Sequence, residues 1–162
     1  MHVSESLRRV FYDAFVARDV AEPLPSLDGT ADPNAASDLM TSRSLAVLGV
    51  REDGIVTGFV RRESLQDVPL SKQMTPLEEA CIVATTTSLR DVVQKLNDSP
   101  FVLVTTLGQP VGWIQRQDLE KPPMRMWLFG MVTLFELSAT QIINQHYADD
   151  SWRQFMLVTA SP

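Results

Sequence analysis

An internal repeat is the feature that most limits what this chain of 162 residues can fold into. When the first half of the chain is shifted by 54 residues, it aligns with the second half without a gap from the first strand of a predicted hairpin to the end of the following short helix. The alignment places Gly54 on Gly108, Gly58 on Gly112, Phe59 on Trp113, Val60 on Ile114 and Leu65 on Leu119. Upstream, the helices align better with a shift of 56, which indicates a small length change in the helix–strand loop. Such self-similarity indicates two copies of one supersecondary unit. Because each copy is too small to bury its own sheet face, we expect the copies to pack against each other.

Each copy is predicted to run helix, strand, strand, short helix. In the first copy, Asp32 and Pro33 are typical of a helix start. Two β-rich runs, at 44–51 and 55–60, then flank a turn at Glu52-Asp53-Gly54 and predict a hairpin, and a short helix is predicted at 61–66. In the second copy, a strand at 81–84 precedes a helix over 88–97 with Thr87 as its cap, a hairpin of 101–106 and 110–115, and a short helix at 116–121. We expect 21–32, rich in Pro, Gly and Asp, to form a loop or irregular edge segment, and 67–79 to be a linker.

Two further helices are predicted outside the repeats. Residues 4–17 place Leu7, Val10, Phe11, Ala14 and Phe15 on one face, with Ser4 as a cap. Residues Met124 to about Tyr147 are apolar nearly all round in their first turns, so this helix must be covered on more than one side, by its own domain or by a second subunit or a further C-terminal region. The predicted segments are an N-terminal helix at 1–18, the repeats at 19–68 and 69–121, and the C-terminal helix and tail at 122–162.

Composition excludes several classes of function. A net charge of −6 and the lack of a basic stripe disfavour nucleic-acid binding. The longest apolar run, Met126 to Phe135, is about half of a membrane span, and the N-terminus lacks a signal-peptide core. Cys81 is the single cysteine, which fits the reducing cytoplasm, and we interpret it as a core thiol. His2 and His146 have no metal-spaced partner and no catalytic set can be assembled, so we expect a soluble cytoplasmic protein that is not an enzyme and holds no metal.

A repeated segment carries the chemistry. Glycine, two apolar residues and, six positions after the glycine, Ser or Asp occur at 58–64 and at 112–118, where a strand ends and a helix begins. Glycine allows another backbone or a ligand to approach the strand closely. The helix N-terminus that follows offers unpaired N–H groups to a phosphate, and an acceptor within the short helix can bind a ribose hydroxyl.

In these residues the chain resembles the CBS domain family, named after cystathionine β-synthase, over roughly residues 20–120 in two copies. The resemblance implies an α+β fold of two pseudo-twofold-related repeats with small mixed sheets, flanked by N- and C-terminal helices. It also implies two clefts between the sheets that hold AMP, ADP, ATP or S-adenosylmethionine. Modules of this family often form dimers and regulate an attached enzyme, transporter or channel, so a homodimer and a downstream effector domain or protein are the expected partners.

The resemblance assigns site residues, with two departures from the family motif. The motif threonine is replaced by Arg61 and Gln115, and its aspartate is present as Asp118 but replaced by Ser64. Asp118 is the expected ribose contact; the structural alternative is a carboxylate in water or paired with Arg116. Arg61 is the expected bidentate phosphate ligand; the structural alternative is a solvated basic pair of Arg61 and Arg62. Gln115 donates a neutral hydrogen bond, which suits an uncharged adenosyl group. The motif glycines Gly58 and Gly112 complete the set. By analogy with the family, the base is expected to contact Pro100, Phe101 and Thr85 in the second copy and Ala46 in the first, although a core role is the default interpretation of these positions.

Two functions follow from these assignments. The first is a sensing module in which a nucleotide tightens the packing of the two repeats. The second is a structural module in which the degenerate motifs bind nothing and the apolar surface of 127–135 drives dimerisation.

Overall fold

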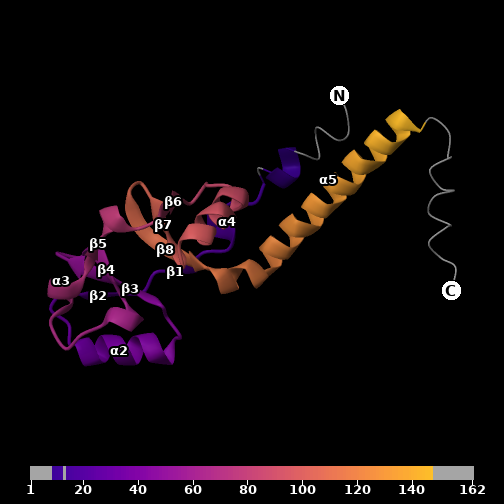
Figure 1. Ribbon diagram of the computed structural model, residues 1–162. Helices are drawn as coiled ribbons and strands as arrows, with labels where there is room; N and C mark the ends of the chain where they lie inside the picture. Colours follow the sequence, from indigo (N-terminus) through magenta and orange to yellow (C-terminus); the bar gives the residue numbers. More distant parts are fainter. Residues whose placement is uncertain (1–8, 13, 148–162) are drawn as a thin grey trace, which may run out of the picture. The chain divides into compact units, whose positions relative to one another are not determined.

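A computed structural model describes residues 9–12 and 14–147. The chain divides into two compact units, Val16–Lys121 and a unit made of Met1–Phe15 together with Pro122–Pro162. The larger one contains both sequence repeats and both sheets (Figure 1).

The two repeats fold into the same order of elements. The first repeat contains β2 (Ser26–Asp28), α2 (Pro33–Ser42), β3 (Val47–Glu52), β4 (Ile55–Arg61) and the 3-10 helix η2 (Arg62–Ser64). The second contains β6 (Ile82–Ala84), α4 (Leu89–Asp98), β7 (Phe101–Thr106), β8 (Gln109–Gln115) and the 3-10 helix η4 (Arg116–Glu120). The short elements around them are η1 (Ala17–Asp19), β1 (Glu22–Pro23), α3 (Leu70–Gln73), β5 (Thr75–Pro76) and η3 (Leu77–Glu79).

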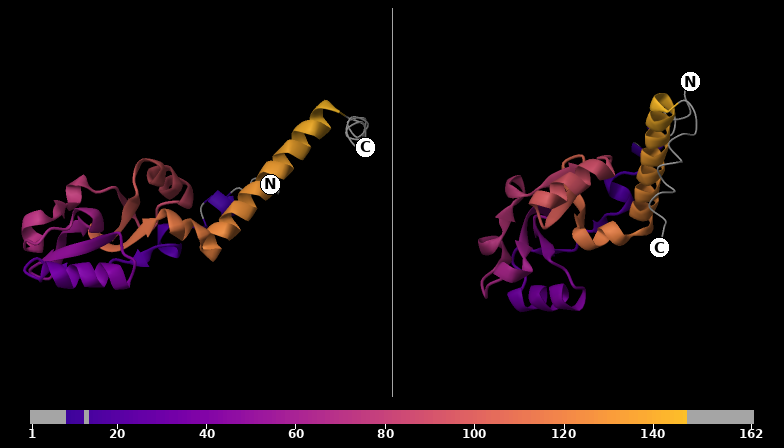
Figure 2. Two further views of the ribbon diagram at one scale, coloured as in Figure 1. Left: turned by 60° about the horizontal axis from the view of Figure 1, so that its bottom comes forward. Right: turned by 45° about the vertical axis from the view of Figure 1, so that its right-hand side comes forward.

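Each repeat receives an edge strand from outside its hairpin. One sheet has the order β2-β3-β4-β5 and the other β1-β8-β7-β6, so β1 pairs with the sheet of the second repeat and β5 with that of the first. In both sheets the hairpin is antiparallel and the strand before the helix, β2 or β6, pairs in parallel. Figures 1 and 2 show α2 along the first sheet and α4 beside the second. The predicted α+β fold of two related repeats with small mixed sheets is confirmed.

The connecting segments contain more regular structure than a loop and a linker. Residues 21–32, expected to form a loop or an irregular edge segment, contain the edge strands β1 and β2, so the edge alternative is correct. The expected linker at 67–79 contains α3, β5 and η3. These strands have two or three residues each, and β1 and β5 each include a proline, so they show no alternating pattern from which a strand could be predicted. They are strands because a longer neighbour supplies their hydrogen-bond partners.

Local signals place the ends of the main elements. Asp32 caps α2 as predicted, accepting a hydrogen bond from the Asn34 backbone N–H at 3.0 Å. Helix α4 is capped by Ser88 through the Asp91 N–H at 3.2 Å, so the prediction of Thr87 was one residue early. Both hairpins turn through two residues of positive φ, Asp53-Gly54 and Leu107-Gly108, a geometry that matches the twist of the flanking strands.

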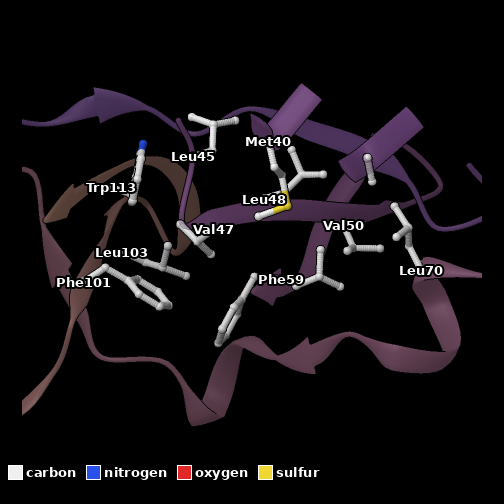
Figure 3. Close-up of a cluster of buried hydrophobic side chains, with 12 residues drawn as sticks. Met40, Leu45, Val47, Leu48, Val50, Phe59, Leu70, Phe101, Leu103 and Trp113 are labelled. Atoms are coloured by element: carbon white, nitrogen blue, oxygen red, sulfur yellow. The ribbon is translucent and has the colours of Figure 1, made fainter. Parts of the chain in front are cut away.

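The core of this unit joins the two repeats. Side chains from α2, β3, β4 and α3 form a cluster with side chains from β7 and β8 (Figure 3), and its members include Met40, Leu48, Val50, Phe59, Leu70, Phe101, Leu103 and Trp113. The rings of Phe59 and Phe101 meet edge to face with centroids 5.5 Å apart. Each repeat therefore completes its core with aromatic side chains of the other.

The smaller unit contains the long helix α5 (Pro122–His146), which begins slightly before the predicted Met124. The predicted helix at 4–17 is only partly covered by the described residues, because residues 4–8, with the Ser4 cap, and residue 13 lie outside them. Residues 9–12 are helical, and the helix has ended by Ala14. The ring of Phe11 occupies the space that a Cβ on Gly130 would need, so it packs directly on the α5 backbone.

Helix α5 keeps much of its apolar surface exposed. Buried positions are Met124, Trp127, Gly130 and Leu134, whereas Phe129 and Phe135 are each 73% exposed. By length and composition alone, α5 is long and apolar enough to cross a membrane. The uninterrupted apolar run at 126–135, on which the expectation from sequence was based, is too short by itself, whereas α5 as a whole also includes the polar residues that follow this run.

Candidate ligand-binding clefts

Two cavities lie where the repeats meet, and Ser44 and Leu45 border both. The Arg61 cleft has a volume of about 280 Å³ and is lined by Ser44, Leu45, Ala46, Arg61, Arg62, Glu63, Pro100 and Phe101. The Asp118 cleft has a volume of about 550 Å³ and is lined by Glu22, Pro23, Leu24, Pro25, Arg43, Ser44, Leu45, Trp113, Gln115, Gln117 and Asp118. Each cleft therefore contains one copy of the repeated motif at the end of its strand.

Arg61 gives the first cleft a positive charge beside aromatic walls. It is the last residue of β4, and its guanidinium carbon lies 5.8 Å from the ring centroid of Phe59 and 5.6 Å from that of Phe101. The rings hold the cation by its attraction to their faces. The buried Nε atom of Arg61 has no hydrogen-bond partner among the described residues. A guanidinium held in this way is suited to an anionic oxygen from a ligand.

Arg62, by contrast, is a structural residue. Its guanidinium donates a hydrogen bond to the carbonyl oxygen of Met40 in the last turns of α2. Arg116, its equivalent in the second repeat, donates from Nε to the Leu96 carbonyl at 3.2 Å at the end of α4. Of the basic pair 61–62, Arg62 is therefore anchored to the end of α2, whereas Arg61 has a buried Nε without a partner among the described residues.

Asp118 is buried at the wall of the second cleft, with 4% of its surface exposed. Its Oδ2 atom accepts a hydrogen bond from the Gln115 backbone N–H at 2.8 Å, and its Oδ1 atom lies 3.0 Å from the Nζ atom of Lys121. Its charged partner is thus Lys121 instead of the Arg116 considered from the sequence. A carboxylate offers about four lone-pair positions, so Asp118 retains the capacity to accept from a ligand hydroxyl.

Lys121 connects Asp118 to the first strand. Its ammonium donates to the Val20 carbonyl at 2.6 Å and forms an ion pair with Glu22 of β1. Burial by itself lowers the pKa of Lys121, but the hydrogen bonds to Glu22 and Asp118 outweigh this effect and raise its pKa above the ordinary value. The Asp118 carboxylate therefore both caps η4 and, through Lys121, holds β1 beside the cleft.

The motif glycines allow the edge strands to approach closely. A Cβ on Gly58 would lie 2.7 Å from the carbonyl oxygen of Thr75, and one on Gly112 would lie 2.8 Å from that of Glu22. These contacts are with the edge strands β5 and β1. Neither glycine lines the Arg61 cleft or the Asp118 cleft, and the close approach of another strand is the role that these contacts support.

The other predicted site residues are only partly brought together. Ala46 and Arg61 line one cleft and Gln115 and Asp118 the other, each with its own motif as expected. Pro100 and Phe101 line the Arg61 cleft and not that of their own motif, because β7 faces the first repeat. Thr85 and Ser64 line neither cleft. The backbone of Thr85 forms hydrogen bonds with the backbones of Arg18 and Thr105. Ser64 is exposed, and its hydroxyl donates a hydrogen bond to the Arg61 carbonyl oxygen at 3.3 Å.

Sequence reasoning missed the walls that come from outside the motifs. Glu22 to Pro25 border the Asp118 cleft because β1 pairs with β8, and this pairing has no sequence signal. Trp113 stands inside the motif and aligns with Phe59, so its indole could have been singled out as a polar replacement. Within residues 9–12 and 14–147, no cluster of three or more His, Cys, Asp or Glu side chains could hold a metal ion.

Comparison with known proteins identifies the fold. No family model matches the chain, and no curated protein matches it in sequence. Among solved structures, CBSX2 of Arabidopsis thaliana, in complex with AMP, is 17% identical with a TM-score of 0.60, covering 69% of this chain and 98% of its own. A CBS domain protein of Thermoplasma acidophilum is also 17% identical, with a TM-score of 0.56 over 75% of this chain and 76% of its own. A conserved protein of Pyrococcus horikoshii is 23% identical, with a TM-score of 0.57 over 64% of this chain and 88% of its own. The larger unit therefore has the fold of a CBS domain pair.

Proposed function

We propose that this protein is a regulatory module that binds an adenosine-containing ligand in the clefts between its two CBS repeats. The observation that carries the proposal is Arg61, whose guanidinium borders a cleft between the repeats with a buried donor that lacks an acceptor in the described part of the chain. The fold adds support, since one protein that shares it was solved with AMP.

The walls of the Arg61 cleft suit the parts of a nucleoside monophosphate. Phe101, Pro100 and Leu45 supply apolar surface for a base, and Arg61 supplies a planar set of donors for a phosphate. Its volume of about 280 Å³ lies near the lower end of the roughly 300–1,000 Å³ typical of ligand sites. A single phosphate is therefore favoured over a polyphosphate in this cleft.

Ligand binding would act on the packing of the two repeats. The cleft takes residues 44–46 and 61–63 from the first repeat and 100–101 from the second, so a ligand inside it contacts both. A ligand that binds the closed arrangement more tightly shifts the population toward it. We propose that an effector domain or partner protein senses this shift.

The proposal is tested by titrating AMP, ADP, ATP and S-adenosylmethionine into the full chain and into Arg61→Ala, with calorimetry and thermal unfolding as measurements. Removing a charged hydrogen-bond donor costs about 1.5–3 kcal/mol, so we expect AMP to bind Arg61→Ala about 10- to 100-fold more weakly. Arg90→Ala is the matched control, since Arg90 is an exposed arginine of α4 outside both clefts. Absence of binding by any of these ligands to the unaltered chain at millimolar concentration contradicts the proposal.

The second candidate function is a structural dimerisation module, favoured by the exposed apolar side chains of α5. It predicts a stable homodimer by light scattering, with no thermal stabilisation by nucleotide. A monomer that nucleotides stabilise argues against it.

A further inference from the structure

We infer that Trp113 is a specificity residue of the Asp118 cleft, where its indole N–H selects ligands that present a hydrogen-bond acceptor on a planar ring. This inference rests on the proposed function, because it assumes that the cleft binds a nucleoside-type ligand. It concerns the second cleft and a residue type that the family motif describes only as apolar.

The indole nitrogen is a buried donor at the edge of this cleft. Trp113 lies in β8, lines the Asp118 cleft and is 2% exposed. Its Nε1 atom is buried and finds no acceptor within residues 9–12 and 14–147. Figure 3 shows this nitrogen at the end of the Trp113 side chain that points away from Phe101 and Leu103.

Packing alone does not explain an indole at this position. In the first repeat the equivalent residue is Phe59, a fully buried ring with no polar atom that fills its place in the core. Buried polar groups in proteins are nearly always hydrogen-bonded, and a buried donor without an acceptor lowers stability. Because Trp113 lines the cleft, a ligand acceptor there would satisfy the N–H group after a small movement of the side chains that bury it.

The surrounding groups indicate the class of ligand. An indole only donates, so Trp113 favours a ring nitrogen or carbonyl oxygen and disfavours an amino group at the same position. Asp118, which lines the same cleft, can accept from sugar hydroxyls. The combination fits a purine nucleoside held by an acceptor on its base and by its diol. It differs from the Arg61 cleft, where the polar group that lacks a partner is a cation.

The test is a double-mutant cycle between the protein and the base of the ligand. In an Arg61→Ala background, which weakens the other cleft, AMP and its 1-deaza, 3-deaza and 7-deaza analogues are titrated by calorimetry into chains with and without Trp113→Phe. Each analogue lacks one ring acceptor. We expect one of the three to bind about 10-fold more weakly than AMP when Trp113 is present, and to bind as AMP does when Trp113 is replaced.

Trp127→Phe is the matched control. Trp127 is also a buried tryptophan whose Nε1 has no acceptor in the described part of the chain, but it lies in α5 and lines neither cleft. We expect it to leave all four affinities unchanged. If Trp113→Phe unfolds the protein, 3-benzothienylalanine at position 113 keeps the shape of the indole without its N–H group.

The outcomes separate this inference from the proposed function. If AMP binds the Arg61→Ala chain and the analogues show no coupling to Trp113, the role of Trp113 is refuted while nucleotide binding stands. If AMP binds the unaltered chain but not Arg61→Ala, the Asp118 cleft takes no nucleotide and the inference is again refuted. If AMP binds neither, both fail together.

Discussion

Arg62 and Arg116 perform the same task at equivalent positions of the two repeats. Each directs its guanidinium to a carbonyl oxygen near the C-terminus of the preceding helix, Met40 in α2 and Leu96 in α4. The last carbonyls of a helix lack partners within the helix and carry partial negative charge, so a cation there is stabilising. Asp118 likewise has a structural task, because it caps η4 and pairs with Lys121. At this scale, motif positions that could contact a ligand also hold the fold together.

Replacing Lys121 with methionine should destabilise the protein by about 1–3 kcal/mol, because Asp118 would remain buried without its cation. Interactions that raise the pKa of Lys121 in the folded state stabilise the protein while the amine is protonated. This contribution is complete below the unfolded-state pKa of about 10.4 and is lost as the pH rises through the higher folded-state pKa. Urea unfolding at pH 7 and above pH 10.5 measures both effects. The exposed Lys72 of α3, replaced by methionine, is the control, and an equal alkaline loss of stability in the Lys121→Met chain and the unaltered chain would contradict the assignment.

At the scale of elements, the two repeats are joined by an exchange of edge strands. β1 and β5 each precede one repeat in the chain and pair with the sheet of the other, on the strand that carries a motif glycine. The absence of a side chain at Gly58 and Gly112 is what lets these strands approach. A strand of two residues adds few hydrogen bonds of its own, so its position depends on this close contact.

Gly112→Ala and Gly58→Ala should each destabilise the protein by about 1–3 kcal/mol, because the new methyl group must displace a backbone carbonyl of the edge strand. Hydrogen exchange should show faster exchange in β1 or β5, according to the glycine that is replaced. Gly108→Asn is the control: Gly108 has a φ of 80° and open space around it, and asparagine tolerates that conformation, so we expect a change below about 0.5 kcal/mol. Unaltered denaturation midpoints for both alanine variants would show that the strands move without penalty.

At the scale of the whole molecule, the unit Val16–Lys121 contains every strand of both sheets, the aromatic contact between the repeats and all residues that line the two clefts. Such a unit has the core and the backbone pairing of an independent domain. Helix α5 lies in the other unit and displays exposed apolar side chains along most of its length.

A fragment of residues 16–121 should therefore fold cooperatively and bind AMP with the affinity of the full chain, within about threefold. It should also be more soluble, because it lacks the exposed apolar surface of α5. Dispersed amide resonances, a cooperative thermal transition and calorimetry measure these properties. A fragment that remains unfolded, although the full chain is folded, would show that residues 1–15 or 122–162 complete its core.

Periodic patterns along the chain were sufficient to predict helices α2, α4 and α5, the two hairpins and their turns, because these elements are stabilised by neighbours in sequence. The repeat also located Arg61 and Gln115 at the ends of β4 and β8 and Asp118 in the 3-10 helix that follows β8, since equal spacing in the two copies indicates equivalent points of a shared fold. The short edge strands, the assignment of Phe101 to the opposite cleft and the pairing of Asp118 with Lys121 were decided only by the tertiary structure. Each depends on segments far apart in the chain, whose contact is determined by how the two sheets pack, and no local pattern carries that information.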